Sequence, residues 1–270
     1  MATDFTDSWR PAGLLRAGLF DLDGVITRTA VVHAAAWKQM FDTFLTGYAE
    51  RTGRPQPPFT DSDYARYVDG RPRFDGVRTF LASRGIELPE GSAADPVGSP
   101  TVQGLGNAKN ELVLARIRDE GVEVYPGSVT FLRAVRAAGL RTAVVSSSAN
   151  TLDVLRAAAL EDLFDARVDG VFAARRRLAG KPAPDTFLAG AAELGCTAGE
   201  AAVFEDALAG VEAGRAGGFG LVVGIDRGDP GDDRHGRDLR EHGADVVVRD
   251  LAELDVRALV SIRGRQGARS

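Results

Sequence analysis

The sequence is poor in cysteine, in long apolar runs and in excess basic charge, and each shortage excludes a class of protein. Its single cysteine, Cys196, cannot form an intramolecular disulfide or a cysteine-based metal cluster. The longest apolar runs, such as 143–145 and 246–248, fall far short of the ~20 residues that span a membrane. A net charge of −5 argues against a general nucleic-acid binder, whose surface is usually basic. We therefore expect no membrane partner, no nucleic-acid partner and a small-molecule substrate.

The N-terminal residues also lack a targeting segment. Residues 1–11 include Asp4, Asp7 and Arg10 and no apolar stretch of the kind that a secretory signal needs. We expect a cytoplasmic protein that acts as a monomer. The 270 residues allow one large or two modest domains, and a chain of this length can bury a sizeable core without a disulfide or a metal.

Short β-rich stretches alternate with segments of helical spacing. The strand candidates are 18–21, 141–146, 201–205 and 219–224, with a weaker one at 244–248, and the helix candidates are 128–138, 151–159, 185–194 and 207–213. This alternation predicts an α/β core of the Rossmann-like, doubly wound kind, with a parallel sheet covered by helices on both faces. Because ligands bind at the carboxyl ends of such strands, the polar residues after each strand are candidates for a site.

The segment 33–120 contains no convincing strand. We expect helices at 33–48, 74–84 and 107–119, and a loop at 91–106. The chain is therefore predicted to divide into a discontinuous α/β core (12–32 and 121–262), an inserted helical cap (33–120) and tails at 1–11 and 263–270, the second of which we expect to be frayed. Our hypothesis is that the cap closes over a site at the strand ends and excludes water from it.

Two carboxylates end the first strand candidate. Asp21 and Asp23 are two residues apart, so in an extended chain their side chains point to one side, and Gly24 then allows a sharp turn. An Asp-x-Asp pair alone is more often a turn or a helix cap than a site. The apolar residues before this pair indicate a strand end, which favours a functional role.

Two further strand or helix boundaries carry groups that suit a phosphate. Ser146, Ser147, Ser148 and Asn150 follow the 143–145 run at a helix start, where hydroxyl and backbone N–H groups either bind an anion or only cap the helix. Lys181 stands between Gly180 and Pro182, just before the helix candidate 185–194. It is either a fixed positive charge beside an anion or a solvated surface lysine.

Two adjacent acids lie at the end of the strand candidate 201–205: Glu205 is its last residue and Asp206 follows it. Neighbouring carboxylates at a buried strand end repel each other unless a cation is present, and hard oxygen ligands suit Mg²⁺. The alternative is a capping Asp beside a solvated Glu. Acids, hydroxyls, a lysine and more acids at successive boundaries of the core together predict a magnesium-and-phosphate site.

These motifs resemble those of the haloacid dehalogenase superfamily. The matching residues are Asp21-x-Asp23-Gly-Val, Ser146, Lys181-Pro-x-Pro-Asp and Glu205-Asp206-x-x-x-Gly, and the helical insertion resembles the small cap of that superfamily. The segments 21–38, 124–127 and 180–185 further resemble the β-phosphoglucomutase subfamily. Two positions depart from its pattern: Arg28 stands where Asp is usual, and Ala149 stands where a basic residue often helps to hold the distal phosphate.

The resemblance implies phosphoryl transfer through an aspartyl-phosphate. It assigns Asp21 as the nucleophile, Asp23 as the general acid and base, and Ser146, Ser147 and Lys181 as ligands of the transferring phosphoryl group. It implies Mg²⁺ held by Asp21, the backbone carbonyl of Asp23 and Asp206, with Glu205 nearby or bound through water. It also implies a cis peptide bond between Lys181 and Pro182.

The resemblance further implies a small sugar phosphate as substrate. The contacts to it would come from Thr29, His33, Trp37, Gly70, Arg73, Lys109, Ser148 and Asn150. Taken alone, Trp37 is more typical of a core residue and His33 is also explained by packing, whereas the guanidinium of Arg73 suits a phosphate because it binds bidentately. We expect the run from Arg175 to Arg177 to be solvated, and we assign no role to His235 or His242.

Three functions remain open at this point. The first is a mutase that interconverts β-glucose 1-phosphate and glucose 6-phosphate through a bisphosphate, and the second is a phosphatase that hydrolyses a small sugar phosphate. The third is a non-catalytic binding module. The third has the least support, because Asp21, Asp23, Lys181 and Asp206 are all present.

Overall fold

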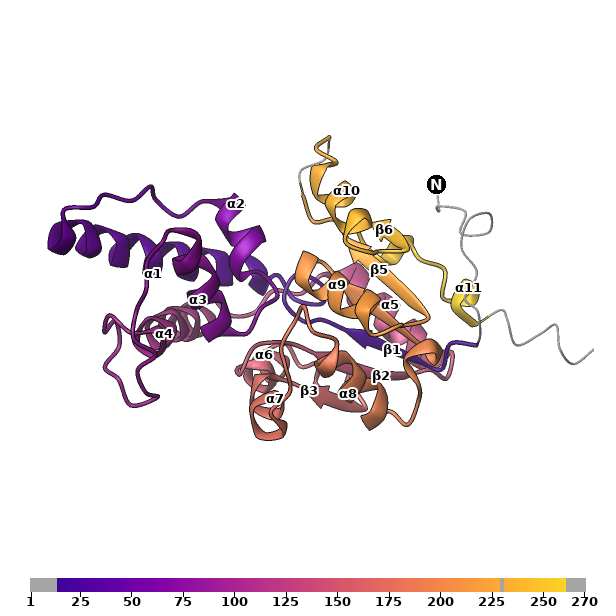
Figure 1. The fold of residues 1–270 in the computed structure, drawn as a ribbon. Coiled ribbons are helices and arrows are strands. Elements are labelled where there is room, and N and C mark those ends of the chain that lie inside the picture. The colour runs from indigo at the N-terminus through magenta and orange to yellow at the C-terminus, as the bar shows by residue number, and fades with distance from the viewer. Residues whose placement is uncertain (1–13, 229–230, 261–270) are drawn as a thin grey trace, which may run out of the picture. The chain divides into compact units, whose positions relative to one another are not determined.

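The computed structural model describes residues 14–228 and 231–260. The chain divides into two compact units, a core unit (Met1–Arg28 with Glu123–Ser270) and a cap unit (Thr29–Val122) (Figure 1). The first boundary precedes the first helix of the cap unit, whereas the boundary expected at 32/33 falls inside that helix. The tails expected at 1–11 and 263–270 lie outside the described residues.

The core unit is built on a six-stranded parallel sheet in the order β3-β2-β1-β4-β5-β6. The strands are β1 (Ala17–Phe20), β2 (Arg141–Val145), β3 (Ala166–Val168), β4 (Ala201–Glu205), β5 (Leu221–Ile225) and β6 (Val246–Val248). Each neighbouring pair is parallel, and β1 lies between β2 and β4 in a common register, with Ala17 opposite Arg141 and Ala201. The prediction of a doubly wound parallel sheet is confirmed. The order changes direction at β1 and β4, which is where such sheets bind ligands.

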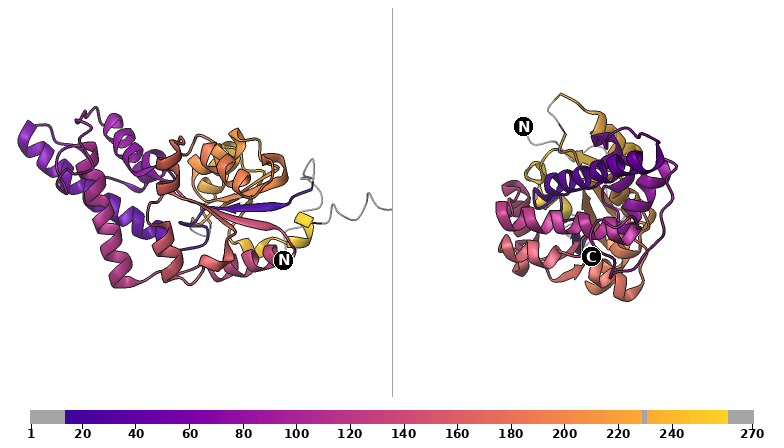
Figure 2. Two further views of the ribbon diagram at one scale, coloured as in Figure 1. Left: turned by 90° about the horizontal axis from the view of Figure 1, so that it is seen from below. Right: turned by 90° about the vertical axis from the view of Figure 1, so that its left-hand side faces the viewer.

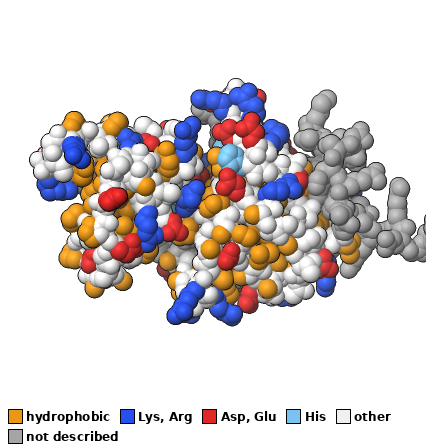
Figure 3. Space-filling model, viewed as in Figure 1, with side chains coloured by type: hydrophobic (Ala, Val, Ile, Leu, Met, Phe, Trp, Pro, Cys, Tyr) orange, Lys and Arg blue, Asp and Glu red, His pale blue; other side chains and the backbone are white. Residues whose placement is uncertain are grey.

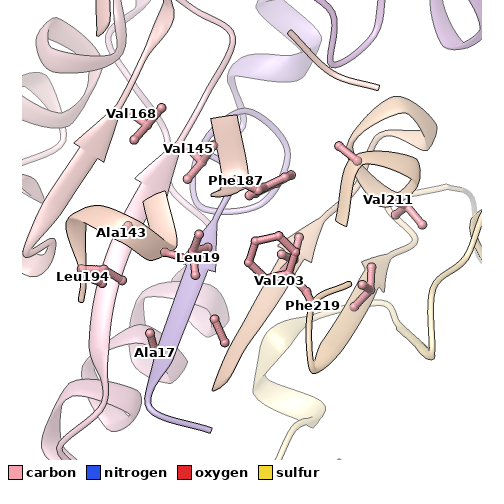
Figure 4. Packing of buried hydrophobic residues seen from close by; sticks show 14 of the residues in the cluster. Ala17, Leu19, Ala143, Val145, Val168, Phe187, Leu194, Val203, Val211 and Phe219 are labelled. Carbon is pink, nitrogen blue, oxygen red and sulfur yellow. The ribbon is translucent and has the colours of Figure 1, made fainter. Parts of the chain in front are cut away.

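Helices cover both faces of this sheet (Figure 2). Those of the core unit are α5 (Pro126–Ala137), α6 (Thr151–Ala157), α7 (Gly170–Arg176), α8 (Asp185–Glu193), α9 (Leu208–Ala216), α10 (Arg234–Glu241) and α11 (Val256–Val260), with 3-10 turns at η2 (Glu161–Leu163), η3 (Ala198–Glu200) and η4 (Leu251–Glu253). Successive side chains of a strand point to opposite faces of the sheet. On one face, Leu19 of β1 packs in the cluster that contains Phe187 of α8 and Val211 of α9 (Figure 4). On the other face, the Phe20 ring meets Phe131 of α5 edge-on.

Sequence patterns missed the weakest elements of the core unit. β3 has three residues and α7 has seven, so neither offers enough residues for a clear period. The sequence patterns predict no helix at α10, a segment dominated by charged residues, yet the structure has one, in which Gly236 and Leu239 are buried. Among the described residues, no helix is both long enough and apolar enough to cross a membrane.

The cap unit is helical. Its elements are α1 (Thr29–Thr52), α2 (Asp61–Asp63), the π-helical turn η1 (Tyr64–Val68), α3 (Arg73–Ser83) and α4 (Val102–Glu120). Its own core is a stack of aromatic rings in which Phe41 lies against Trp37, Phe59 and Phe80. The cap unit therefore has a hydrophobic core separate from that of the sheet.

Two predicted boundaries in the cap were wrong. The first helix begins at Thr29, not at residue 33, and continues to Thr52. The loop expected at 91–106 ends early, because Thr101 caps α4 by accepting a hydrogen bond from the Gly104 N–H at 2.9 Å. Gly104 and Gly106 suggested a loop, but they permit close packing: an added Cβ at Gly106 would lie 2.5 Å from the Phe74 ring.

Candidate active site

Three acids and one lysine meet at the carboxyl edge of the sheet in the core unit. Asp21 directly follows β1, Glu205 ends β4 and Asp206 follows it. Each of these three residues offers a carboxylate oxygen, and the three oxygens lie within 4.8 Å of one another. The parallel strands bring them together because their carboxyl ends share one edge.

Lys181 is the cation of this group and is only 2% exposed. Its Nζ donates to Asp21 Oδ1 and Glu205 Oε1, each at 2.6 Å, and to the Val145 carbonyl at 3.1 Å. Burial alone would lower the pKa of the Lys181 ammonium, but the two carboxylates outweigh burial and raise that pKa. The bond between Lys181 and Pro182 is cis, as expected. Lys181 is thus a buried, charged donor, not a solvated surface lysine.

Asp21 is buried beside other acids. Burial raises the pKa of the Asp21 carboxyl well above its usual value, Lys181 lowers it, and the charges of Glu205 and Asp23 raise it further. One ammonium shared between Asp21 and Glu205 leaves the group of Asp21, Glu205 and Asp206 with excess negative charge. A second cation would favour the ionised form of Asp21.

The donor set fits Mg²⁺, which prefers oxygen ligands and usually takes one or two carboxylates in addition to water and substrate phosphate. Both oxygens of Glu205 are already engaged, because Oε1 accepts from Lys181 and Oε2 accepts from the Ala207 N–H at 2.8 Å. The carboxylates of Asp21 and Asp206 are therefore better placed to hold the ion directly than Glu205 is.

Two glycines allow the acids to pack this closely. At Gly24, whose φ is +90°, an added Cβ would lie 1.8 Å from Asp206 Oδ2. At Gly210, at the start of α9, an added Cβ would lie 1.7 Å from Glu205 Oε1. The glycine spacing in the Glu205-Asp206-x-x-x-Gly210 motif thus has a physical cause, since any side chain would occupy the place of the Glu205 carboxylate.

The loop of residues 146–150, which follows β2, is held together by hydrogen bonds between its own residues. Ser146 Oγ accepts from the Ser148 N–H at 3.1 Å, and Ser148 Oγ accepts from the Asn150 N–H at 3.1 Å. Ser146 is buried, and its Oγ also donates to Asp23 Oδ2 at 3.4 Å, which joins this loop to the first motif. The N–H groups of Ser148 and Asn150, which the sequence suggested as anion donors, therefore already donate hydrogen bonds within the loop. The loop is held in place by Gly170, whose N–H donates to the Ser148 carbonyl at 3.0 Å.

His235 adjoins the acids, although sequence patterns assigned it no role. Its Nε2 lies 2.9 Å from the backbone carbonyl of Asp206, so this nitrogen carries the ring proton and donates it. His235 stands in the first turn of α10 in a charge-rich stretch, and no motif in the sequence marks it.

Three of the predicted substrate residues meet inside the cap unit. Lys109 Nζ lies 2.9 Å from His33 Nδ1 and 5.0 Å from the centre of the Trp37 ring. Lys109 is 5% exposed, so a buried cation contacts an aromatic face and an imidazole. Trp37 also stacks on Phe41, as expected for a core residue.

The other predicted cap residues lie at the starts of helices or at a turn. Arg73 is the first residue of α3, and its guanidinium lies over the Phe74 ring. Its buried Nε has no hydrogen-bond partner among the residues that the structure describes. Burial lowers the pKa of Arg73. Gly70 has a φ of +70° in the turn before α3, and Thr29 is buried at the start of α1.

Comparison with known proteins shows the family of this chain. The family of haloacid dehalogenase-like hydrolases matches residues 15–218. The β-phosphoglucomutase of Mycobacterium tuberculosis is 57% identical over 241 residues, which cover 89% of this chain and 91% of that protein. The β-phosphoglucomutase of Bacillus subtilis is 31% identical over 248 residues, covering 91% and 94%.

Solved structures agree on the fold. The crystal structure of a β-phosphoglucomutase from Clostridium difficile superposes with a TM-score of 0.68 at 22% identity and covers 93% of this chain and 99% of that one. The resemblance inferred from the motifs is confirmed. The chain belongs to the haloacid dehalogenase-like hydrolase family of enzymes, among the β-phosphoglucomutases and their relatives.

Proposed function

We propose that this enzyme transfers a phosphoryl group through an aspartyl-phosphate on Asp21, with Mg²⁺, and interconverts β-glucose 1-phosphate and glucose 6-phosphate. The observation that carries the proposal is the buried contact of Lys181 with Asp21 and Glu205 beside Asp206. The choice of substrate is supported by the 57% identity to a protein named β-phosphoglucomutase.

The first step is attack on phosphorus by a carboxylate oxygen of Asp21. The new bond joins Asp21 to phosphorus, the bond from phosphorus to the sugar oxygen breaks, and Asp23 donates a proton to that oxygen. Lys181 offsets the repulsion between the Asp21 carboxylate and the anionic phosphate. Mg²⁺, held by Asp21, the Asp23 carbonyl and Asp206, would supply further charge neutralisation and orient the phosphoryl oxygens.

The acceptor of the phosphoryl group decides between the two candidate activities. In a mutase, phosphorylated Asp21 gives its phosphoryl group to the 6-hydroxyl of β-glucose 1-phosphate while Asp23 takes the hydroxyl proton. The resulting bisphosphate then returns its C1 phosphoryl group to Asp21 and leaves as glucose 6-phosphate. In a phosphatase, water is the acceptor. Both use the same core residues, so product analysis has to separate them.

Substrate contacts are proposed for two groups of residues. Ser146, Ser147, Ser148 and Asn150 would bind the transferring phosphoryl group or the substrate near it. In the cap unit, Arg73 is proposed to bind the phosphate that is not transferred, because a guanidinium nitrogen buried without a partner gains most from a charged acceptor. Lys109, His33, Trp37, Gly70 and Thr29 are proposed to complete the sugar-phosphate contacts.

The test follows two products in one reaction. The enzyme is incubated with Mg²⁺, β-glucose 1-phosphate and a trace of glucose 1,6-bisphosphate, while glucose 6-phosphate and free phosphate are both measured. We expect glucose 6-phosphate to accumulate well ahead of phosphate, and the α-anomer to give no product. Phosphate release without glucose 6-phosphate would overturn the mutase proposal in favour of the phosphatase.

A pair of matched variants tests the nucleophile. Asp21→Asn removes the attacking carboxylate and should abolish both products. Asp162→Asn makes the same chemical change at an exposed residue of η2, which precedes β3 and so lies toward the amino ends of the strands. It should leave the rate unchanged. An Asp21→Asn enzyme with the rate of the Asp162→Asn enzyme would exclude Asp21 as the nucleophile.

A further inference from the structure

Arg227 uses every donor of its guanidinium group. It follows β5 and is largely buried, with a side chain that is 16% exposed. Its five hydrogen bonds run from Nε to the Gly24 carbonyl at 2.9 Å, from Nη1 to the Arg249 carbonyl at 2.8 Å and Asp250 Oδ2 at 3.1 Å, and from Nη2 to the Val25 carbonyl at 3.2 Å and Ser128 Oγ at 3.1 Å. A guanidinium has five N–H groups, so its donor capacity is filled.

Two of these bonds end on the turn that follows the predicted catalytic acids. The Gly24 N–H donates to the Thr27 carbonyl at 2.7 Å, which orients the peptide between Asp23 and Gly24. Arg227 holds the next two carbonyls, those of Gly24 and Val25. The peptides on both sides of Gly24 are therefore fixed, and they are fixed where the Gly24 backbone lies against the Asp206 carboxylate.

The other contacts of Arg227 are with residues at or near the starts of α5 and η4. The guanidinium carbon lies 3.6 Å from the centre of the Tyr125 ring, immediately before α5. Asp250 is itself immobilised, since its Oδ1 accepts from the Ala252 N–H at 2.8 Å as the cap of η4. Arg227 thus connects the Gly24–Val25 turn to the starts of α5 and η4.

We propose that Arg227 is a positioning residue for phosphoryl transfer, which sets the place of Asp23 relative to Asp21 and Asp206 by holding the turn at Gly24 and Val25. The inference rests on the proposed function of those acids. It assigns Arg227 no contact with substrate. Its role would be to prevent the Asp23 side chain from moving out of reach of the sugar oxygen, and displacements of about 1 Å can cost ~10²-fold in rate.

Arg215 provides a matched control. Its Nε and Nη2 donate to the Gly243 carbonyl at 3.0 and 2.7 Å, and Nη2 also donates to Asp245. Arg215 therefore joins α9 to the segment before β6. This segment lies toward the amino ends of the strands, whereas the acids lie at the carboxyl ends. Both arginines bind backbone carbonyls and an aspartate, but Arg227 alone of the two contacts the turn after Asp23.

The experiment compares kcat and KM for β-glucose 1-phosphate in Arg227→Met, Arg227→Lys and Arg215→Met. We expect Arg227→Met to lower kcat by ~10²-fold while KM changes by less than ~3-fold, because substrate contacts are intact and only the reacting geometry is lost. Arg227→Lys keeps the charge but loses the planar fork, so it should also lower kcat by at least ~10-fold. Arg215→Met should change neither constant.

Chemical rescue separates positioning from general stabilisation. In Arg227→Ala, millimolar guanidinium should raise kcat, whereas equal ammonium chloride should not, and neither salt should alter Arg215→Ala. Melting temperatures of all variants show whether a loss of kcat follows a loss of stability.

The outcomes distinguish this inference from the proposed function. Arg227→Lys and Arg227→Ala enzymes with wild-type kcat, or with a changed KM alone, would overturn the positioning role. A loss of kcat in Arg227→Ala that tracks melting temperature and is not rescued by guanidinium would do the same. If Arg227→Met does not fold, Arg227→Lys and the rescue of Arg227→Ala carry the test. A wild-type enzyme that transfers no phosphoryl group at all would instead refute the proposed function.

Discussion

Replacing Gly210 with alanine tests whether the Glu205 carboxylate depends on close packing against the backbone of α9. In most helices Gly→Ala is stabilising by ~1 kcal/mol, because glycine loses more conformational entropy on folding. At Gly210 the new Cβ would lie 1.7 Å from Glu205 Oε1 and 2.0 Å from its Cδ. Atoms that are not bonded to each other cannot approach this closely. Either the Glu205 carboxylate or the start of α9 must move.

The energy of this conflict can be bounded from the contacts of Glu205. The residue is 0% exposed, and its two oxygens accept from Lys181 Nζ and the Ala207 N–H. Displacing the carboxylate breaks a buried ion pair, which typically costs about 3–5 kcal/mol. After the helix gain of ~1 kcal/mol is subtracted, we expect Gly210→Ala to lower the free energy of unfolding by about 2–4 kcal/mol. Activity should fall with it, because Lys181 loses a fixed partner.

Urea unfolding of a double-mutant cycle assigns the cause. Glu205→Ala removes the group that collides with the new methyl, so Gly210→Ala added to Glu205→Ala should be neutral or stabilising by ~1 kcal/mol. The control is Gly47→Ala in α1, where, among the described residues outside the helix backbone, the added Cβ would meet only the end of the Arg51 side chain, at 3.0 Å. That variant should be neutral or slightly stabilising.

Two results would refute the reasoning. A Gly210→Ala protein as stable and as active as the wild type would show that the Glu205 carboxylate can relocate at no cost. An equal loss of stability with and without Glu205 would place the strain in the helix backbone rather than in the carboxylate.

Three further substitutions test the site and the core unit. Gly24→Ala combines a strained φ of +90° with a Cβ 1.8 Å from Asp206 Oδ2. Because this displaces a proposed ligand, the Mg²⁺ concentration for half-maximal rate should rise at least ~10-fold in a Mg²⁺ titration. Lys181→Met leaves buried acids without their cation; it should abolish activity and lower the free energy of unfolding by about 3–5 kcal/mol in urea. Burial raises the pKa of Asp165, but hydrogen bonds led by the Thr142 N–H outweigh it and lower that pKa. The ionised Asp165 therefore stabilises the fold above the carboxyl pKa of the unfolded chain, and this stabilisation is lost as pH falls through the lower pKa of the folded state. In urea titrations Asp165→Asn should lower the free energy of unfolding at pH 7, and the difference from the wild type should shrink progressively below about pH 4.

The chemistry of the candidate site was open to prediction from the sequence because it depends on specific side chains. Asp21, Lys181 and Glu205 lie at the ends of strands or just before a helix, and parallel strands deliver such residues to one edge. Strand periodicity and sheet topology predict the convergence of Asp21 and Glu205, whereas the buried position of Lys181 was only implied by the family resemblance. Their roles in catalysis stay predictions until the variants are measured.

Element boundaries were predicted less well, for local reasons. α4 begins at Val102 because the Thr101 side chain caps it, although the glycines that follow suggested a loop. Those glycines are required by neighbours distant in sequence, as Gly106 is by Phe74. A glycine that permits close packing and a glycine that permits a turn look alike in a single sequence.

Sequence patterns could not identify Arg227 or His235, because the contacts that link these two residues to the candidate site are made to backbone carbonyls. Arg227 binds Gly24 across 203 positions and His235 binds Asp206 across 29, and neither contact restricts the residue type at the accepting position. Every residue has a carbonyl, so such a bond leaves no motif on the acceptor side. A carboxylate that pairs with Lys181, by contrast, restricts both partners to a few residue types. Sequence patterns therefore identify groups that perform chemistry more readily than groups that hold the backbone around them. The proposed positioning role of Arg227 can be inferred only from a structure, in which each of its five donors is traced to an acceptor.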